Sequence, residues 1–344
     1  MKYNLADVCV RLSSGKGIPA KMIESSGRFP VYGGNGLRGY TEQSNFDGEC
    51  AIIGRQGAFC GNVRFFSGKA YMTEHAIVAV ANKDHNTRYL AYLLSTMSLG
   101  HLSAQSAQPG LSVKTLSKVT VDLPSKEEQD KAVNILSSLE DKIAENSKIN
   151  DNLQQQAQAI YTSMFINNAD PAWRQGHLSD LITVKYGKDH KKLFDGCYPV
   201  YGSGGIMRYV ERPLYDKESV LIPRKGTLNN VIYVNQPFWS VDTMFYTEMR
   251  LPNVAKYVFH FIKSKDLASM NAGSAVPSMT TDILNAIEVA IPSAQDLEKF
   301  ETLVSPLYRA VQENNIQSAK LAELRDTLLP KLMSGELDVA NIQF

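Results

Sequence analysis

The sequence predicts an α+β fold built by tandem duplication, with two small, mainly β domains separated by two long helices that pack as an antiparallel coiled coil. The first observation behind this prediction is an internal repeat, in which the second half of the chain resembles the first half. The second is a change of composition within each copy, from short runs rich in Gly and aromatic residues to a long stretch with few Gly or Pro residues. The third is the spacing of apolar residues in that stretch, which alternates between three and four.

The repeat is clearest around a few short segments. Residues 29–36 (FPVYGGNG) return as residues 198–205 (YPVYGSGG), and residues 53–57 (IGRQG) return as residues 222–226 (IPRKG). Later in each copy, Pro124-Ser125 returns as Pro292-Ser293. A solenoid repeat has roughly 20 to 50 residues, so this unit is too long to be one. Each copy is instead large enough for a domain followed by an extra element.

The composition divides the chain into four segments. They are a first β domain at residues 1–125, a first long helix at 126–166, a second β domain at 167–293 and a second long helix at 294–344. Ser125 and Glu128 have the spacing of a capping box, which marks the start of the first helix. Pro306 lies early in the second helix and is expected to kink or delay it.

Both helices carry a stripe of seam positions, meaning residues that would face a partner helix. These positions include Leu136, Leu139, Ile143, Asn146, Leu153 and Ile160 in the first helix, and Leu307, Val311, Asn314, Leu321 and Leu328 in the second. A long amphipathic helix cannot bury its stripe alone, so the two equivalent stripes are expected to pack together. Antiparallel packing is favoured because parallel packing would crowd both β domains at one end. Asn146 and Asn314 either fix the register or are partly solvated in a weak seam.

Charge is unevenly distributed, although 36 basic and 35 acidic side chains nearly cancel overall. Residues 1–125 hold 13 basic and 8 acidic side chains, and residues 167–293 hold 14 and 12. The helical segments are acidic, with 4 basic against 7 acidic and 5 basic against 8 acidic side chains. Basic domains on acidic helices favour a polyanion as the partner of the domains and protein as the partner of the helices. Chance distribution in a neutral protein is the alternative.

The remaining composition indicates a soluble protein. No run approaches the roughly 18 apolar residues of a membrane span, and the N-terminus lacks the apolar core of a signal peptide, so we expect a cytoplasmic location. The four cysteines, Cys9, Cys50, Cys60 and Cys197, have unrelated spacings. They therefore predict reduced thiols and no zinc site.

Sequence patterns of enzymes are absent. Residues 34–39 match G-x-G-x-x-G formally, but no helix pattern follows them and the second copy breaks the spacing. The nearest string to an amino-methyltransferase pocket, at residues 170–173, lacks the second proline. The six histidines are not paired at the spacing of metal ligands. We therefore expect a chain without catalytic residues, bound metal or cofactor.

Two segments resemble a known family. Residues 121–129 (VDLPSKEEQ), leading into residues 135–143 (ILSSLEDKI), are similar to the junction between target-recognition domain and conserved helix in specificity subunits of type I restriction-modification enzymes. Residues 328–337 (LLPKLMSGEL) are similar to the second conserved region of that family. One departure is Asp296-Leu297 in the second copy, where the first copy has Glu128-Gln129.

The resemblance implies that each β domain is a target-recognition domain for one half of a bipartite double-stranded DNA site. It also implies that the helices set the unread gap and dock two methyltransferase subunits. Those partners would carry S-adenosylmethionine and methylate adenine N6, and a restriction subunit would use ATP and Mg²⁺ to translocate and cleave DNA. Two alternatives remain, a two-headed adaptor for protein or glycan and an enzyme with an unrecognised site.

Candidate DNA contacts come from basic and aromatic residues in the repeated segments. Arg55, Gln56, Arg224 and Lys225 follow equivalent strands, where Arg or Lys can donate to phosphate or to guanine. Further candidates for phosphate contacts are Lys16, Arg38, Lys188 and Arg208. For Tyr32 and Tyr201 two roles are open: they contact the DNA duplex, or they pack in the core of their domain. Ser106 and Ser274 lie in a loop that occurs in both copies. This loop either binds DNA or packs the β domain against a long helix.

Overall fold

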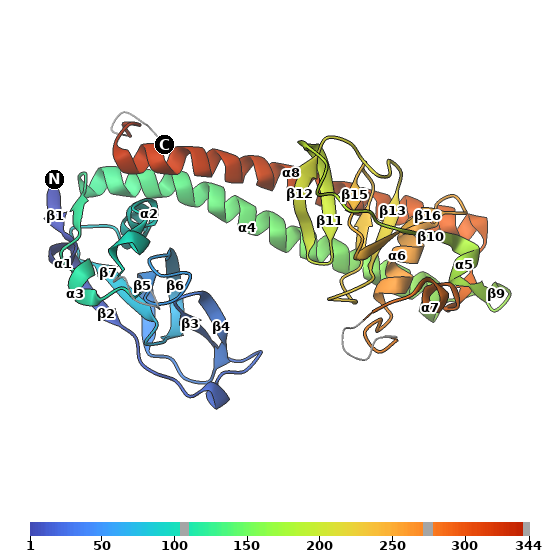
Figure 1. Cartoon of the computed structure of the whole chain (residues 1–344), viewed down its shortest axis with the longest axis horizontal. Coiled ribbons are helices and arrows are strands. Elements are labelled where there is room, and N and C mark those ends of the chain that lie inside the picture. Colours follow the sequence, from blue (N-terminus) through green and yellow to red (C-terminus); the bar gives the residue numbers. More distant parts are fainter. Residues whose placement is uncertain (104–109, 271–277, 340–344) are drawn as a thin grey trace. The chain divides into compact units, whose positions relative to one another are not determined.

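The computed structural model describes residues 1–103, 110–270 and 278–339. The chain forms two compact units (Figure 1). The first unit consists of Met1–Asn146 with Ile316–Phe344, and the second unit consists of Ser147–Asn315. Each unit contains one β-rich part, which we name the first or second head, and one half of each long helix. The α+β class predicted from the sequence is confirmed.

The first head is built around a six-stranded sheet of strand order β2-β7-β5-β6-β3-β4. Its strands are β2 (Cys9–Ser14), β3 (Phe29–Gly33), β4 (Gly36–Thr41), β5 (Phe46–Gly54), β6 (Val63–Met72) and β7 (Ala76–Ala81), and β1 (Lys2–Asn4) pairs separately with β8 (Thr120–Asp122). Its helices are α1 (Leu5–Val8), α2 (Thr87–Thr96) and α3 (Val113–Leu116), with 3₁₀ turns η1 (Ala20–Met22) and η2 (Leu99–Leu102). The Asn86 side chain caps α2 by accepting from the amides of Arg88 and Tyr89.

The second head contains a four-stranded sheet, β10-β16-β13-β14, and a three-stranded sheet, β12-β11-β15. The strands are β10 (Ile182–Tyr186), β11 (Asp195–Gly202), β12 (Gly205–Val210), β13 (Ser219–Pro223), β14 (Ile232–Val234), β15 (Trp239–Ser240) and β16 (Met244–Met249), and β9 (Arg174–His177) pairs with β17 (Glu288–Ile291). Its helices are α5 (Leu178–Leu181), α6 (Ala255–Lys263) and α7 (Thr281–Asn285).

The two heads share a hairpin that is irregular at the same position. The register shifts between Val31 and Tyr32 in the β3–β4 hairpin, and between Val200 and Tyr201 in the β11–β12 hairpin. In both heads the first strand of the hairpin also pairs in parallel with a later strand, β6 or β15. Because the bulge and the parallel pairing recur together, the repeat seen in the sequence is a repeat of backbone structure.

The long helices are α4 (Lys126–Thr162), followed by the π-helical turn η3 (Ser163–Asn167), and α8 (Ala294–Ser334). The predicted capping box is present: Glu128 Oε2 accepts from the Ser125 amide at 2.8 Å, and Ser125 Oγ accepts from the Glu128 amide at 3.3 Å. The expected delay at Pro306 is wrong. Helix α8 begins at Ala294, where the Ser293 hydroxyl accepts from the Asp296 amide at 3.1 Å and fixes an earlier start.

Within each unit, α4 and α8 pack side by side and run antiparallel (Figure 1). In the first unit Leu136 shares a core with Leu328 and Leu332, and Asn146 Nδ2 donates to Gln317 Oε1 at 2.8 Å. Later residues of α4 thus meet earlier residues of α8. The second unit shows the same order. There Ala157 shares a core with Val304 and Leu307.

The predicted seam positions all face inwards to some degree. Leu136 and Asn146 are buried, and the other nine are half-buried: Leu139, Ile143, Leu153, Ile160, Leu307, Val311, Asn314, Leu321 and Leu328. The middle of the pair is polar. Asn314 Nδ2 donates to Asn150 Oδ1 at 2.8 Å, and Asn150 Nδ2 donates to Asn315 Oδ1 at 2.9 Å. Of the two roles left open for the seam asparagines, these cross-helix bonds favour fixing the register.

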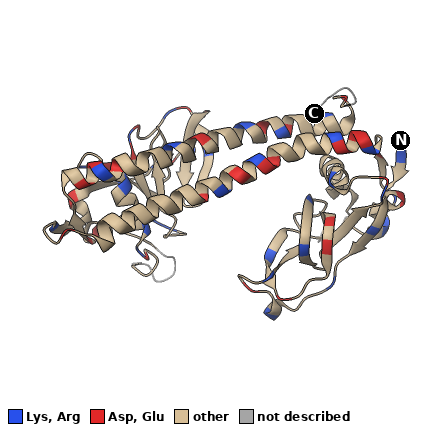
Figure 2. Ribbon diagram, turned by 180° about the vertical axis from the view of Figure 1, so that it is seen from behind, with Lys and Arg blue, Asp and Glu red and all other residues tan. Residues whose placement is uncertain are grey.

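Among the described residues, no helix is both long and apolar enough to span a bilayer. The four cysteines are free thiols, and burial raises the pKa of the Cys9 and Cys50 thiols to about 12. Acidic and basic residues both occur along α4 and α8 (Figure 2).

Candidate nucleic-acid interface

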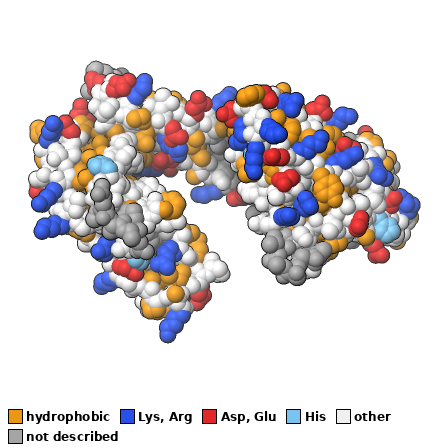
Figure 3. All heavy atoms as spheres, in the orientation of Figure 1, with side chains coloured by type: hydrophobic (Ala, Val, Ile, Leu, Met, Phe, Trp, Pro, Cys, Tyr) orange, Lys and Arg blue, Asp and Glu red, His pale blue; other side chains and the backbone are white. Residues whose placement is uncertain are grey.

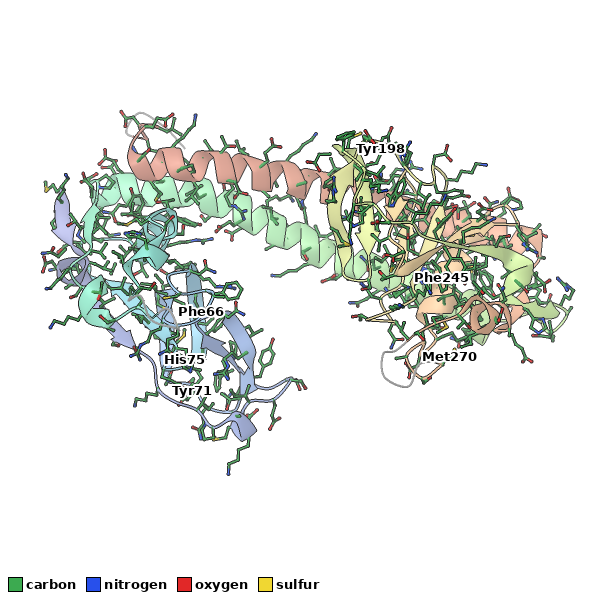
Figure 4. All side chains as sticks on the ribbon, in the orientation of Figure 1. Phe66, Tyr71, His75, Tyr198, Phe245 and Met270 are labelled. Atoms are coloured by element: carbon green, nitrogen blue, oxygen red, sulfur yellow. The ribbon has the colours of Figure 1, made fainter. Side chains whose placement is uncertain are left out.

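Three turns of the first head meet around Arg55. They are the tip of the β3–β4 hairpin, the loop after β5 and the turn between β6 and β7, which carries His75 (labelled in Figure 4). The Arg55 amide donates to the carbonyl of His75 at 3.0 Å. A Cβ on Gly34, in the hairpin tip, would lie 2.9 Å from the same carbonyl oxygen and 3.4 Å from the Arg55 nitrogen. A side chain at Gly34 would therefore force the hairpin tip and the turn apart, and the second head has Ser203 at the aligned position.

The Arg55 side chain is oriented by the backbone. Its Nη1 atom donates to the Glu74 carbonyl at 3.3 Å, while the side chain is half-buried and its other donors are not used by this bond. Gln56 is exposed next to it. Glu74 Oε1 and His75 Nε2 lie 3.2 Å apart, and both side chains are more than 40% exposed. The turn therefore presents one oriented guanidinium, one amide and one acid-histidine pair to solvent.

The second head repeats this arrangement with different side chains. The Arg224 amide donates to the Thr243 carbonyl at 2.9 Å, and Arg224 Nη1 donates to the Asp242 carbonyl at 3.2 Å. Lys225 is exposed next to it, in the position of Gln56. The Arg224 guanidinium also lies over the Tyr186 ring, 5.3 Å from its centroid. The two predicted arginines are thus structurally equivalent.

The lysines of the early Gly-Lys segments adjoin the same turns. The Lys16 amide donates to the Met72 carbonyl at 2.9 Å, and the Lys188 amide donates to the Ser240 carbonyl at 2.8 Å. A Cβ on Gly15 would lie 2.1 Å from the Met72 carbonyl oxygen. This glycine serves the close approach of the chain's own backbone. Both lysine side chains are exposed.

The other predicted residues divide into two groups. Arg38 is exposed on β4. Arg208 is occupied within the second head, where its Nη2 atom donates to Asp195 Oδ1 at 2.7 Å and to the Leu193 carbonyl at 3.0 Å. The Asp195 carboxylate therefore neutralises part of the charge that Arg208 could offer to a phosphate, and the role of Arg208 as a phosphate contact stays a prediction.

The two tyrosines pack against aromatic rings. Tyr32 is half-buried with its ring 5.0 Å from that of Phe66, and Tyr201 is 9% exposed with its ring 6.2 Å from that of Phe238. Burial raises the pKa of both phenols. Of the two roles considered for these tyrosines, contact with DNA and packing in the core, Tyr201 has the second. Ser106 and Ser274 lie outside the described residues.

Sequence reasoning missed the residues that hold the hairpin tips. Arg64 Nη2 donates to the Asn35 carbonyl at 3.2 Å in the first head, and Asn230 Nδ2 donates to the Ser203 carbonyl at 2.6 Å in the second. These contacts fix the tip next to the arginine loop. They join residues that are not aligned by the repeat, so self-comparison could not have found them.

Each head is also fixed to a long helix by a basic residue. In the first unit Arg88 of α2 donates to Glu140 Oε2 of α4 at 2.7 Å, and the Tyr92 hydroxyl donates to the same oxygen at 2.5 Å. In the second unit Lys256 of α6 donates to Glu301 Oε1 of α8 at 2.6 Å and to Glu218 Oε1 at 3.0 Å. Arg88 and Lys256 occupy the same position of the repeat, because their separation along the chain equals that of the two repeated Pro-Ser pairs.

A histidine extends the contact in the second unit. His260 is 2% exposed, with Nε2 3.0 Å from the Tyr308 hydroxyl and Nδ1 2.8 Å from Gln158 Oε1 of α4. Burial lowers the pKa of His260 to about 4, and nearby Lys263 adds to this effect. The imidazole is therefore neutral near pH 7. It packs here as a structural residue between α6 and both long helices.

The long helices expose apolar side chains. Ile316 and Leu324 of α8 are 50% and 46% exposed in the first unit, and Ile149 of α4 and Leu303 of α8 are 39% and 46% exposed in the second. Single exposed apolar side chains are normal on a protein surface, whereas a contiguous patch of them marks a surface that binds protein. On the drawn face of each head, by contrast, basic side chains are mixed with acidic ones (Figure 3).

No group of three potential metal-ligating side chains occurs in residues 1–103, 110–270 or 278–339. The interface described above instead offers guanidinium, ammonium and amide donors in shallow turns. Such donors suit hydrogen bonds to phosphate oxygens and to base edges.

Comparison with known proteins places this geometry in context. A family model described as Type I restriction modification DNA specificity domain matches residues 1–155 and 172–321, which cover most of both copies. The specificity subunit of the type I restriction enzyme EcoprrI from Escherichia coli is 40% identical over 124 residues, which are 35% of this chain and 31% of that protein. This chain therefore matches less than one third of that relative's length.

Two further matches extend over the whole chain. A putative type I specificity subunit of Mycoplasma pneumoniae is 22% identical and covers 94% of this chain and 93% of its own length. The crystal structure of a type I restriction-modification S subunit from M. genitalium superposes with a TM-score of 0.66 at 19% identity, over 96% of this chain and 95% of that one. The structural match supports the duplicated α+β fold. Together these matches favour DNA specificity over the adaptor and enzyme alternatives.

Proposed function

Because the chain belongs to the type I restriction-modification DNA specificity family, we propose that it reads a bipartite site in double-stranded DNA, with one half-site per head. The observation that carries this proposal is the arginine that both heads hold with the same two backbone hydrogen bonds. Two equivalent donor sets in one chain match a target of two parts. This role needs no catalytic residue in the chain itself, and binding to cellular DNA implies a cytoplasmic location.

The long helices are the proposed docking surface for two methyltransferase subunits. The excess of acidic over basic residues in both segments supports binding to protein and not to DNA there, and the exposed Ile and Leu side chains on α4 and α8 are accessible to a partner. Those partners would bring S-adenosylmethionine and modify adenine N6. A restriction subunit, where the complex has one, would bring ATP and Mg²⁺. We assign none of these cofactors to residues of this chain.

The helix pair is also proposed to set the length of the unread spacer. Asn150 and Asn314 bond to each other across the pair, so deleting residues 147–153 and 311–317 removes one heptad from each helix around a matched position. Seven residues span about 10 Å of helix, which corresponds to about three base pairs of B-form DNA. Matched heptads keep the remaining seam positions in phase.

The test is to express this double deletion with its methyltransferase partner and to map modified adenines across a genome. We expect both half-sites to stay the same and the spacer to shorten by about three base pairs. A control variant that replaces the same heptads with other heptads of equal length keeps the original spacer. If the deletion variant still methylates sites with the original spacer, the helices do not set the spacer. If the unaltered chain and its partner leave DNA unmodified, the proposed function itself is wrong.

A further inference from the structure

The sheets of the two heads differ, but the loop that carries the arginine has the same backbone contacts in both. In both heads the loop arginine receives the same contacts: its amide donates to a carbonyl of the neighbouring turn, and its Nη1 donates to the carbonyl one residue earlier. Its own carbonyl accepts from Leu111 at 2.8 Å in the first head and from Met279 at 2.9 Å in the second. The backbone therefore holds the arginine in the same way in both heads, and Arg224 in addition lies over the Tyr186 ring.

The side chains around this arginine are different. Gln56 in the first head corresponds to Lys225 in the second, and both are exposed. His75 corresponds to Thr243, since these residues supply the equivalent carbonyls. His75 is held 3.2 Å from Glu74, while Asp242, which stands in the place of Glu74, has a shorter side chain. Each head thus presents one common cation and its own pair of neighbours.

Common and differing residues suit different parts of DNA. A group that two heads present identically, while they read different half-sites, fits what all sequences share, and that is the phosphate backbone. Groups that differ fit the base edges. In the major groove, Gln pairs bidentately with adenine N6 and N7, whereas Lys donates to guanine O6 and N7.

On the premise of the proposed function, we propose that Gln56 and His75 determine the half-site of the first head, and Lys225 and Thr243 that of the second. Arg55 and Arg224 bind a phosphate in both half-sites and position these residues against the bases. The first half-site accordingly contains an adenine read by Gln56, and the second contains a guanine read by Lys225.

The specificity test uses the full chain with its methyltransferase partner and maps all modified sites. Gln56→Lys is expected to change one base pair of the first half-site from adenine towards guanine, and to leave the spacer and the second half-site as they were. Lys225→Gln makes the reciprocal change in the second half-site. Gln43→Lys is the matched control, since Gln43 is an exposed glutamine of the same head outside the three turns, and it keeps the original site. A Gln56→Lys variant with an unaltered site would overturn the assignment.

The arginine test measures binding of the complex to duplexes that carry every single-base change in the first half-site. Arg55→Ala is expected to weaken binding about tenfold on all of them equally, and to lower the slope of log affinity against log salt by about one. Relaxed preference at a single base pair would instead make Arg55 a base-reading residue and overturn its role as the common contact. Absence of any sequence preference in the unaltered complex would contradict the proposed function itself, which separates the two failures.

Discussion

The two contacts that fix the heads to the long helices occupy the same repeat positions but use different chemistry. Arg88 corresponds to Lys256, Tyr92 to His260, and Glu140 to Tyr308, each pair being separated by the same length of chain. The carboxylate partner has moved, because Glu140 serves Arg88 whereas Glu301, two helical turns before Tyr308, serves Lys256. Position was thus retained after duplication while the residues that make the contact were exchanged.

The exchange changes how deeply charge is buried. The Arg88 side chain is 21% exposed and that of Glu140 is 31% exposed. The Lys256 side chain is only 7% exposed, lies between two carboxylates and packs 5.3 Å from the Tyr233 ring centroid. A buried ion pair costs more when one partner is removed than a half-exposed pair does. The second contact should therefore depend more strongly on each of its members.

The largest expected effect comes from Lys256. Lys256→Met should destabilise the second unit by about 3 to 5 kcal/mol, because Glu218 and Glu301 are left close together without their cation. Both tryptophans, Trp173 and Trp239, belong to the second unit, so urea unfolding followed by tryptophan fluorescence reports on that unit. Exposed Lys217→Met is the control and should leave the midpoint unchanged. If Lys256→Met and Lys217→Met unfold at the same urea concentration, the buried contact of Lys256 contributes no more stability than an exposed lysine, and the proposed difference from the Arg88 contact is wrong.

A smaller effect is expected from the titration of His260 in the second unit. His260 has a pKa near 6.5 when unfolded and about 4 when folded, so the unfolded state binds the additional proton as pH falls. The stability from neutral His260 is complete above pH 6.5 and is lost between pH 6.5 and 4. Between pH 7.5 and 5 the loss should be about 2 kcal/mol, measured by the same fluorescence assay. His260→Gln should remove this part of the pH dependence, and an unchanged profile would show that other groups cause it.

The smallest effect is expected at the half-exposed pair. Arg88→Ala should destabilise the contact between α2 and α4 by about 1 to 2 kcal/mol, since water can reach the Glu140 carboxylate that remains. Hydrogen exchange of the α2 amides should accelerate roughly tenfold. Lys83→Ala, at an exposed position shortly before α2, is the control and should leave the exchange as it is. If Arg88→Ala lowered the free energy of unfolding as much as Lys256→Met does, burial would not distinguish the two contacts.

Much of the architecture could be predicted because an internal repeat and a regular spacing of apolar residues are both visible in the sequence. The near-constant offset between the two copies revealed the duplication, and the alternating spacing of three and four identified the seam of α4 and α8. The equivalence of Arg55 and Arg224 followed from the same comparison. The segment boundaries at residues 125, 166 and 293 stay a prediction, since the compact units cut through the helices and not between the segments.

The parts that sequence did not predict depend on backbone atoms and on distant partners. The carbonyls of Glu74 and Asp242 orient the arginines, and a carbonyl has no signature in the sequence. The Arg88 and Lys256 contacts join residues 52 and 45 positions apart. A signal did exist for these two, since the repeat aligns Arg88 with Lys256. The ion pair of Arg208 could not be predicted either, because its partner, Asp195, meets it only when β11 and β12 pair.

The first unit is made of two segments that are far apart in the sequence, and this affects the order in which the chain can fold during synthesis on the ribosome. The second unit is one uninterrupted stretch, so its core can close once residue 315 has emerged. The first unit is made from residues that precede the second unit and residues that follow it: the side chains that pack with Leu136 and its neighbours include Leu332 and Met333, which are translated after residue 315. The core of the first unit can therefore close only after that of the second, and until then the apolar stripe at the start of α4 stays exposed on the nascent chain.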